Sequence, residues 1–124
     1  MKRSVVLSIR GRQSYDGQEP EVIELVTEGT MEFHDGGWDI SYEESELTGL
    51  AGVTTVFRVE PGKVTLIRTG KLNSRMVFQQ GITHDSLYQM EFGALLLSVE
   101  ATSVYYDIVP DGGVIDYHLD IRAK

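Results

Sequence analysis

The sequence predicts an all-β protein whose chain forms a single up-and-down antiparallel β-barrel of about eight to ten strands. Apolar residues recur mostly at every second position, which is the spacing of a strand with one buried face. Short turn sequences, many of them containing one of the 13 glycines, separate nearly all of these apolar runs. Sequential hairpins with one apolar face must hide that face and both sheet edges, and closure into a barrel does this. A two-layer sandwich is the alternative, but it needs long crossing connections that this chain lacks.

Composition limits the class of protein. A chain of 124 residues suits one domain, residues 1–124, with a core of its own. The formal net charge of -8 opposes binding to a phosphate backbone, so we expect no nucleic-acid partner. No apolar run is long enough for a membrane-spanning helix, so no membrane partner is expected. The chain has no cysteine, and its basic start lacks the apolar segment of a secretion signal, which together predict a cytoplasmic protein.

Ten segments have the strand pattern, and each is bounded by turn residues. They are Lys2 to Arg12, Glu21 to Phe33, Trp38 to Ser45, Val53 to Val59, Val64 to Gly70, Arg75 to Gln80, Ser86 to Glu91, Leu95 to Glu100, Ser103 to Val109 and Val114 to Arg122. The stretch from Glu43 to Gly52 is the best candidate for a helical turn, because two glycines end a short polar run there.

Turn chemistry predicts the register of two early hairpins. Asp35-Gly36 tolerates the positive φ of a tight turn and pairs Phe33 with Trp38. Pro61-Gly62 centres the next hairpin, whose predicted partners are Val59 with Val64, Phe57 with Leu66, and Thr55 with Arg68. Both registers place apolar residues together on one face.

Three later turns extend the same apolar face. A turn at Phe92-Gly93 places Met90 opposite Leu95. A turn at Ala101-Thr102 places Val99 opposite Val104, and a turn at Asp111-Gly112 places Tyr106 opposite Tyr117. The opposite face then carries polar residues such as Asp107, Asp116 and His118. All five hairpins are therefore consistent with one continuous meander.

Three runs of the chain resemble the YwiB-like family of small uncharacterised bacterial proteins. They are ELVTEG at residues 24–29, YEESELTG at residues 42–49 and VTLIRTG at residues 64–70. The resemblance covers almost the whole chain. It implies a calycin-type barrel, related in shape to lipocalins and fatty-acid-binding proteins, in a cytoplasmic protein of a Gram-positive bacterium. It brings no known activity and no catalytic or binding residue.

Arg68 is the most informative single residue, because the predicted register places its guanidinium on the apolar inner face. A buried charge without a partner is costly, so an anion should meet it. Alternation along the strand from Trp38 also turns Glu44 inward. Three interpretations remain open: a structural ion pair of Arg68 with Glu44 (or with Glu28 across a bulge), a ligand carboxylate or phosphate bound by Arg68, and a bulge that turns Arg68 to solvent.

Aromatic side chains on the inner face either fill the barrel or line a cavity in it. The candidate ligand-binding residues are Arg68, Glu44, Tyr42, Trp38, Tyr88, Tyr106 and Tyr117. The predicted function is binding of a small apolar or anionic molecule in the barrel interior. The alternative is a non-catalytic structural or protein-interaction domain with a filled core.

Other functions receive less support from the sequence. His118 with Asp107, Asp116 and Asp120 is an outward polar group on two strands, and we predict no metal and no cofactor. Nucleophile-elbow, phosphate-loop, dinucleotide and zinc-protease motifs are missing, so an enzyme is not expected; if there is one, Glu44 beside Arg68 is the candidate acid or base. Outward apolar residues predict a homodimer, and they are Val6, Val26, Val56 and Ile67.

Overall fold

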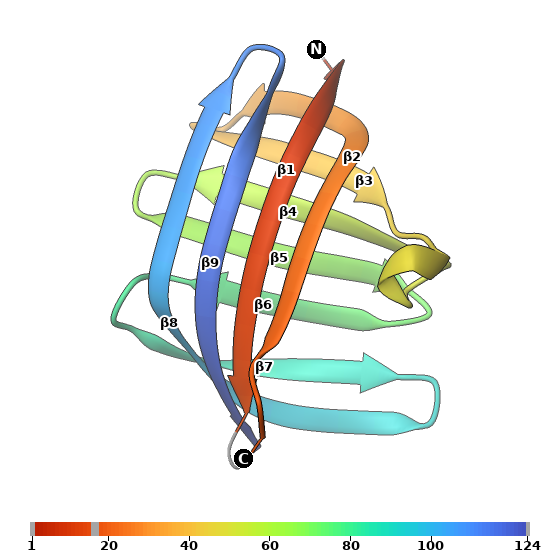
Figure 1. Cartoon of the computed structure of the whole chain (residues 1–124), viewed down its shortest axis with the longest axis vertical. Coiled ribbons are helices and arrows are strands. Elements are labelled where there is room, and N and C mark those ends of the chain that lie inside the picture. The colour runs from red at the N-terminus through yellow and green to blue at the C-terminus, as the bar shows by residue number, and fades with distance from the viewer. Residues whose placement is uncertain (1, 16–17, 124) are drawn as a thin grey trace.

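The computed structural model describes residues 2–15 and 18–123, and within them the chain forms a closed β-barrel (Figure 1). Each strand is hydrogen-bonded to its neighbours in sequence order, which confirms the up-and-down barrel. The described strands are β1 (Lys2–Tyr15), β2 (Glu21–His34), β3 (Gly37–Glu43), β4 (Val53–Glu60), β5 (Lys63–Gly70), β6 (Asn73–Phe78), β7 (Thr83–Met90), β8 (Gly93–Val109) and β9 (Gly112–Ala123). They are nine in number rather than the ten segments predicted.

The odd number of strands determines how the barrel closes. In an up-and-down barrel, consecutive strands alternate in direction, so a first and ninth strand run the same way. Strands β1 and β9 accordingly pair in parallel, from Val6 opposite Gly112 to Tyr15 opposite Ile121. The predicted antiparallel barrel is confirmed for every pair of consecutive strands, and the seam between β1 and β9 is the parallel pairing that closes it.

The two early hairpins have the predicted registers. Phe33 lies opposite Trp38 across the β2–β3 turn, and Thr55 lies opposite Arg68 across β4–β5. At the β2–β3 turn Asp35 has φ 49° and Gly36 has φ 76°, the pair of positive values that a tight primed turn requires. Turn residues that demand one backbone conformation therefore predicted these pairings correctly.

Two later turns are each displaced from their predicted positions. Strands β7 and β8 turn at Glu91-Phe92, where Met90 is opposite Gly93, and β8 and β9 turn where Val109 is opposite Gly112. Each observed pairing differs from the predicted one by two residues. Because side chains alternate with period two, this shift leaves every residue on its predicted face.

The predicted hairpin at Ala101-Thr102 does not exist, since β8 runs through it as one strand. The register of β8 against β9 shifts between Ala101 and Ser103, so Thr102 is an extra residue in a β-bulge. A bulge changes which alternate positions face inward. In the sequence this change of alternation looks the same as one strand ending and another beginning, so the pattern predicts a turn there. This correction accounts for the difference between ten strands and nine.

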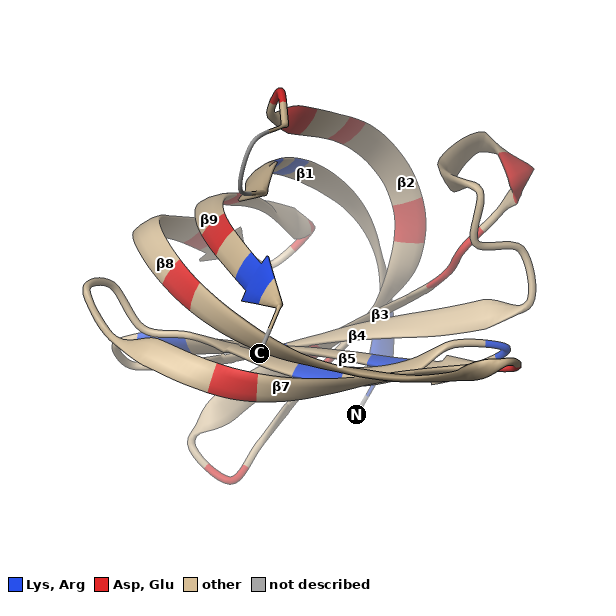
Figure 2. Ribbon diagram, turned by 90° about the horizontal axis from the view of Figure 1, so that it is seen from below, with Lys and Arg blue, Asp and Glu red and all other residues tan. Residues whose placement is uncertain are grey.

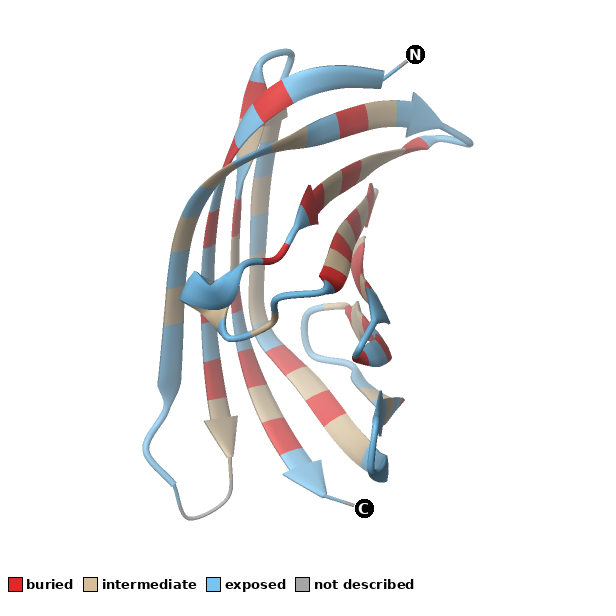
Figure 3. Ribbon diagram, turned by 90° about the vertical axis from the view of Figure 1, so that its right-hand side faces the viewer, coloured by how far each residue is buried: buried red, intermediate tan, exposed pale blue. Residues whose placement is uncertain are grey.

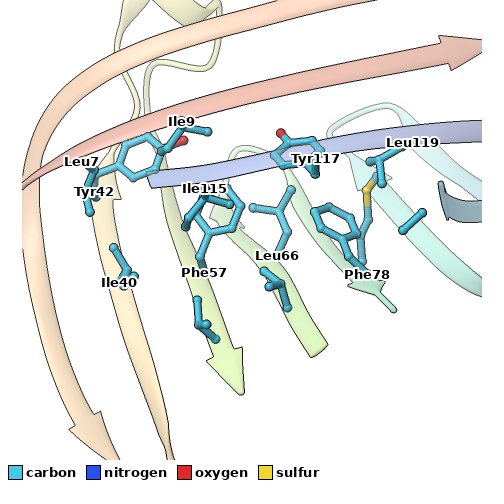
Figure 4. Close-up of a cluster of buried hydrophobic side chains, with 14 of the residues drawn as sticks. Leu7, Ile9, Ile40, Tyr42, Phe57, Leu66, Phe78, Ile115, Tyr117 and Leu119 are labelled. Carbon is cyan, nitrogen blue, oxygen red and sulfur yellow. The ribbon is translucent and has the colours of Figure 1, made fainter. Parts of the chain in front are cut away.

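The buried hydrophobic core lies inside the barrel, and burial alternates along the strands (Figure 3). In Figure 4, Phe57, Leu66 and Phe78 extend from β4, β5 and β6 toward Tyr117 and its neighbours on β9. The ring centroids of Phe78 and Tyr117 are 4.9 Å apart. Side chains from opposite walls are therefore in contact in the middle of the barrel.

One part of the wall is less tightly closed. Strand β2 pairs with β3 only from Thr30 to His34, so residues 21–29 of β2 are hydrogen-bonded to β1 alone. The 3-10 helix η1 (Glu46–Thr48), in the β3–β4 connection, lies beside this open stretch (Figure 1). It corresponds to the helical turn predicted between Glu43 and Gly52. None of the described helices is long and apolar enough to cross a membrane.

Candidate functional site

A cavity of about 450 Å³ lies where β2 and β3 separate, between the inner wall of the barrel and the β3–β4 connection. Its lining residues are Ile9, Val22, Ile23, Glu24, Leu25, Tyr42, Glu44, Leu47, Thr48, Leu50, Arg68 and Tyr117. Half of these side chains are apolar, and the polar ones come from β2, β3, β5, β9 and the β3–β4 connection. The volume is in the range of small-molecule binding sites.

Four of the seven predicted site residues meet in this cavity: Tyr42, Glu44, Arg68 and Tyr117. The sheet register brings them together. Tyr42 lies opposite Thr55, and Thr55 lies opposite Arg68, so three neighbouring strands contribute to one row of inward side chains. The arrangement thus follows from the hairpin pairings that the turns specify.

Arg68 is only 7% exposed, yet its guanidinium makes no hydrogen bond or ion pair within the described residues. Its Nε is completely enclosed and has no partner. The ion pair between Arg68 and Glu44, one of the three open interpretations, is not formed, and Glu28 is exposed on the outer face of β2. The bulge that would turn Arg68 to solvent is also not present, since β5 pairs regularly with both neighbours.

The carboxylate of Glu44 is held by two threonine hydroxyls instead of by Arg68. Thr55 Oγ1 donates to Glu44 Oε2 at 2.5 Å, and Thr48 Oγ1 donates to Glu44 Oε1 at 2.9 Å. Thr55 belongs to the barrel wall, whereas Thr48 belongs to η1. Glu44 therefore ties the covering helix to the wall.

Both phenols of the cavity stay protonated over a wide range of pH. Burial raises the pKa of Tyr42 far above its usual range, and the nearby Glu44 carboxylate raises it further. Burial also raises the pKa of Tyr117, an effect that the charge of Arg68 opposes. The cavity therefore holds two neutral O–H groups beside one cation and one carboxylate.

The other three predicted site residues pack against the core but do not line this cavity. Trp38 contacts Phe33, with ring centroids 4.9 Å apart. Tyr106 donates to Glu60 O at 3.2 Å and accepts from Gly62 N at 3.4 Å, which ties β8 to the β4–β5 turn. Tyr88 lies opposite Ser74 on the β6–β7 hairpin. These three side chains therefore pack against the core and do not contribute to this cavity.

Sequence reasoning missed the apolar half of the site and one polar neighbour. Ile23 and Leu25 come from the inward alternation of β2, and Leu47 and Leu50 come from the β3–β4 connection. Ser74, directly opposite Arg68 on β6, is 7% exposed and its Oγ also lacks a partner. The pairing of Arg68 with Ser74 could have been predicted from the β5–β6 turn, had that turn been assigned a register.

Metal-binding clusters of three or more His, Cys, Asp or Glu are not found in the described part of the chain. On β9, His118 Nε2 is 3.9 Å from Asp116 Oδ1 at the surface. Figure 2 shows acidic residues spread over several strands, including β2, β7, β8 and β9. Acidic decoration of the outer face explains these groups without a ligand.

The fold and the cavity define a small closed β-barrel with a polar-ended cavity where β2 and β3 separate. The chain belongs to the family described as a domain of unknown function, DUF1934, whose match covers residues 7–124. It is similar to the uncharacterised β-barrel protein YwiB of Bacillus subtilis (strain 168), with 28% identity over 119 residues, 96% of this chain and 82% of that protein. The crystal structure of the YwiB protein from Bacillus subtilis superimposes with a TM-score of 0.74 at 28% identity, covering 97% of this chain and 78% of that one. The family resemblance expected from the sequence is thereby confirmed.

Proposed function

We propose that this protein is a calycin-type barrel that binds a small, mainly apolar molecule with one anionic group in the cavity between β2 and β3. The observation that carries the proposal is Arg68, a buried cation that lines the cavity without a protein partner. Burial of an unpaired charge destabilises the folded protein. Proteins keep such destabilising groups mainly at sites where binding or catalysis needs them. A ligand anion is the natural counter-charge.

The remaining lining supports an apolar body for the ligand. Ile9, Ile23 and Leu25 form one side of the cavity, and Leu47 and Leu50 cover it from the β3–β4 connection. Leu47 is 93% exposed, which places an apolar side chain at the entrance. An apolar ligand would bury these side chains and contribute the larger part of the binding free energy.

A structural or protein-interaction domain with a filled core is the competing function. The tight packing of Phe57, Phe78 and Tyr117 favours it for the middle of the barrel. A filled-core domain gives no reason for the unpaired Arg68 in the cavity between β2 and β3, so we favour ligand binding. The proposal includes a cytoplasmic location, with which a cysteine-free chain is compatible.

The proposal is tested by comparing Arg68→Met with wild type. We expect the variant to bind the anionic apolar probe anilinonaphthalene sulfonate at least about tenfold more weakly, because the counter-charge is lost. We also expect its free energy of unfolding to rise by about 1–3 kcal/mol, since an apolar side chain replaces an unpaired buried charge. Fluorescence titration and urea unfolding measure the two quantities.

Arg75→Met is the matched control, because Arg75 is an exposed arginine on the neighbouring strand β6. Arg58 is unsuitable as a control, although it lies on the outer face, since it donates to His34 O and Asp35 O and supports the β2–β3 turn. Equal probe affinity of Arg68→Met and wild type would contradict the proposed function.

A further inference from the structure

We propose that the group recognised by Arg68 is a single carboxylate, and that Glu44 is the residue that limits the ligand to one negative charge. This inference rests on the proposed function, because it specifies the ligand of the same cavity. It follows from the way the two side chains are held, and it excludes a phosphate monoester as the ligand head group.

The orientation of the guanidinium favours a planar group with two oxygens. The Nε of Arg68 is completely enclosed and has no hydrogen-bond partner. Its terminal nitrogens make no hydrogen bond to the described residues and are not enclosed in this way, and the residue lines the cavity. The two terminal N–H groups therefore face the cavity as a fork, which matches the two oxygens of a carboxylate.

Glu44 fixes a negative charge in the same cavity. Each of its two oxygens accepts a hydrogen bond from a threonine, Thr48 on η1 and Thr55 on β4. Among the described residues this carboxylate forms no ion pair with Arg68, although both side chains line the cavity. An anion bound to Arg68 in the cavity therefore also meets the charge of Glu44.

The charge balance of the cavity then disfavours a ligand with more than one negative charge. Arg68 and Glu44 contribute one charge of each sign, and the remaining charged residue of the lining, Glu24, forms an ion pair with Arg10 at 2.8 Å. A ligand with one carboxylate is attracted by Arg68 and repelled by Glu44. A doubly charged phosphate doubles its attraction to Arg68 and its repulsion from Glu44 alike, so the opposed pair gives the second charge little net gain to offset its larger desolvation cost.

The two phenols complete the set of donors. Tyr42 and Tyr117 line the cavity with Arg68, and both keep their protons because burial raises their pKa values. The Tyr42 O–H interacts with Glu44, which leaves the Tyr117 O–H as a donor for the ligand carboxylate, and a neutral O–H adds no positive charge for a second negative charge to meet. The site thus has several donors but only one cation.

The test compares three ligands with the same alkyl chain: octanoate, octyl phosphate and octanol. Isothermal titration at about pH 8 is suitable, because a phosphate monoester is then mostly doubly charged. For wild type we expect octanoate to bind at least about tenfold more tightly than either of the other two ligands. This comparison needs no substitution, so it does not depend on the folding of any variant.

Glu44→Gln identifies the residue responsible for the restriction. We expect octyl phosphate to gain affinity in this variant, so that the preference for octanoate falls at least about threefold. Glu43→Gln is the matched control: Glu43 is adjacent, exposed, and accepts from Thr54 Oγ1 at 3.0 Å. It removes the same charge from the molecule but, being in solvent, should leave the preference unchanged.

The possible failures are distinguishable. If none of the three ligands binds and the anilinonaphthalene sulfonate titration is also negative, the proposed function itself is wrong. If octyl phosphate binds wild type as tightly as octanoate, or if Glu44→Gln and Glu43→Gln have the same effect, ligand binding stands and the carboxylate assignment is overturned. Equal binding of octanol and octanoate overturns the role of Arg68 in recognising the head group.

Discussion

Tyr117 reaches the cavity because residue 11, its partner on the parallel strand β1, is glycine. A Cβ at position 11 would lie 2.5 Å from the Cζ and the hydroxyl of Tyr117, closer than atoms can pack. We predict that Gly11→Ala displaces the ring and lowers the free energy of unfolding by about 1–3 kcal/mol. Urea unfolding measures this change. Arg12→Ala, an exposed neighbouring position, should alter stability by less than about 0.5 kcal/mol, and equal losses in both variants would refute the packing argument.

Tyr42 makes stability depend on pH in the alkaline range. Its pKa in the folded protein is raised by burial and by Glu44, whereas in the unfolded chain it titrates near pH 10. Its contribution is therefore complete below about pH 10 and is lost as the pH rises further, because only the unfolded state releases the proton. Tyr42→Phe should reduce the fall in unfolding free energy between about pH 8 and 11. An unchanged fall in urea titrations at the two pH values would contradict this prediction.

At the scale of elements, η1 is held over the cavity through Thr48. Its Oγ1 donates to Glu44 Oε1 at 2.9 Å, and the helix has few other ties, since none of its residues is buried. We predict that Thr48→Val loosens this cover, so that amide hydrogens of residues 46–50 exchange faster and a bound ligand dissociates faster. Thr54→Val removes the equivalent bond to Glu43 outside the cavity. The same acceleration in Thr54→Val would show that the Thr48–Glu44 bond has no special role.

The elements that could be predicted from the sequence are those fixed by local chemistry. Asp35-Gly36 allowed one tight turn, and that turn set the pairing of β2 with β3. The change of phase in β8 near Thr102 was ambiguous, because a bulge and a chain reversal produce the same local pattern. Only the pairing of β8 with β9 over its whole length distinguishes the two.

Some residues of the candidate site could likewise be predicted from the sequence, and others could not. The inward direction of Arg68 and Glu44 followed from alternation along two strands whose registers were known. The apolar wall from β2 could not be placed, because β1 and β2 are joined by a longer connection that fixes no register by turn chemistry. The lack of a bond between Arg68 and Glu44 depends on Thr48 and Thr55, a three-dimensional arrangement that no spacing in the sequence specifies.

At the scale of the whole molecule, charge opposes nucleic-acid binding. The net charge of -8 is spread over several strands, and acidic bands recur among the basic ones in Figure 2. Arg10 is engaged with Glu24, and Arg58 with Asp39, which leaves these arginines less available for phosphate contacts. From this charge distribution we expect no extended contact with a phosphate backbone.

Self-association is the last prediction. Val6 and Val26 are 55% and 71% exposed on β1 and β2, and Val56 is the half-buried cross-strand partner of Ile67 on β4 and β5. Outward apolar residues on neighbouring strands favour association, and symmetric dimers are the commonest soluble oligomers. We therefore predict a homodimer, for which light scattering at micromolar concentration should give twice the monomer mass of 13.9 kDa.

Paired substitutions locate the dimer interface, because β1–β2 and β4–β5 lie on different sides of the barrel in Figure 3. Val56→Lys with Ile67→Lys tests one side, and Val6→Lys with Val26→Lys tests the other. The double variant that returns the mass to 13.9 kDa identifies the contacting face, since two buried lysine charges destabilise an apolar interface. A monomer mass for the wild type would reject the dimer, and a dimer that survives both double variants would place the interface elsewhere on the barrel.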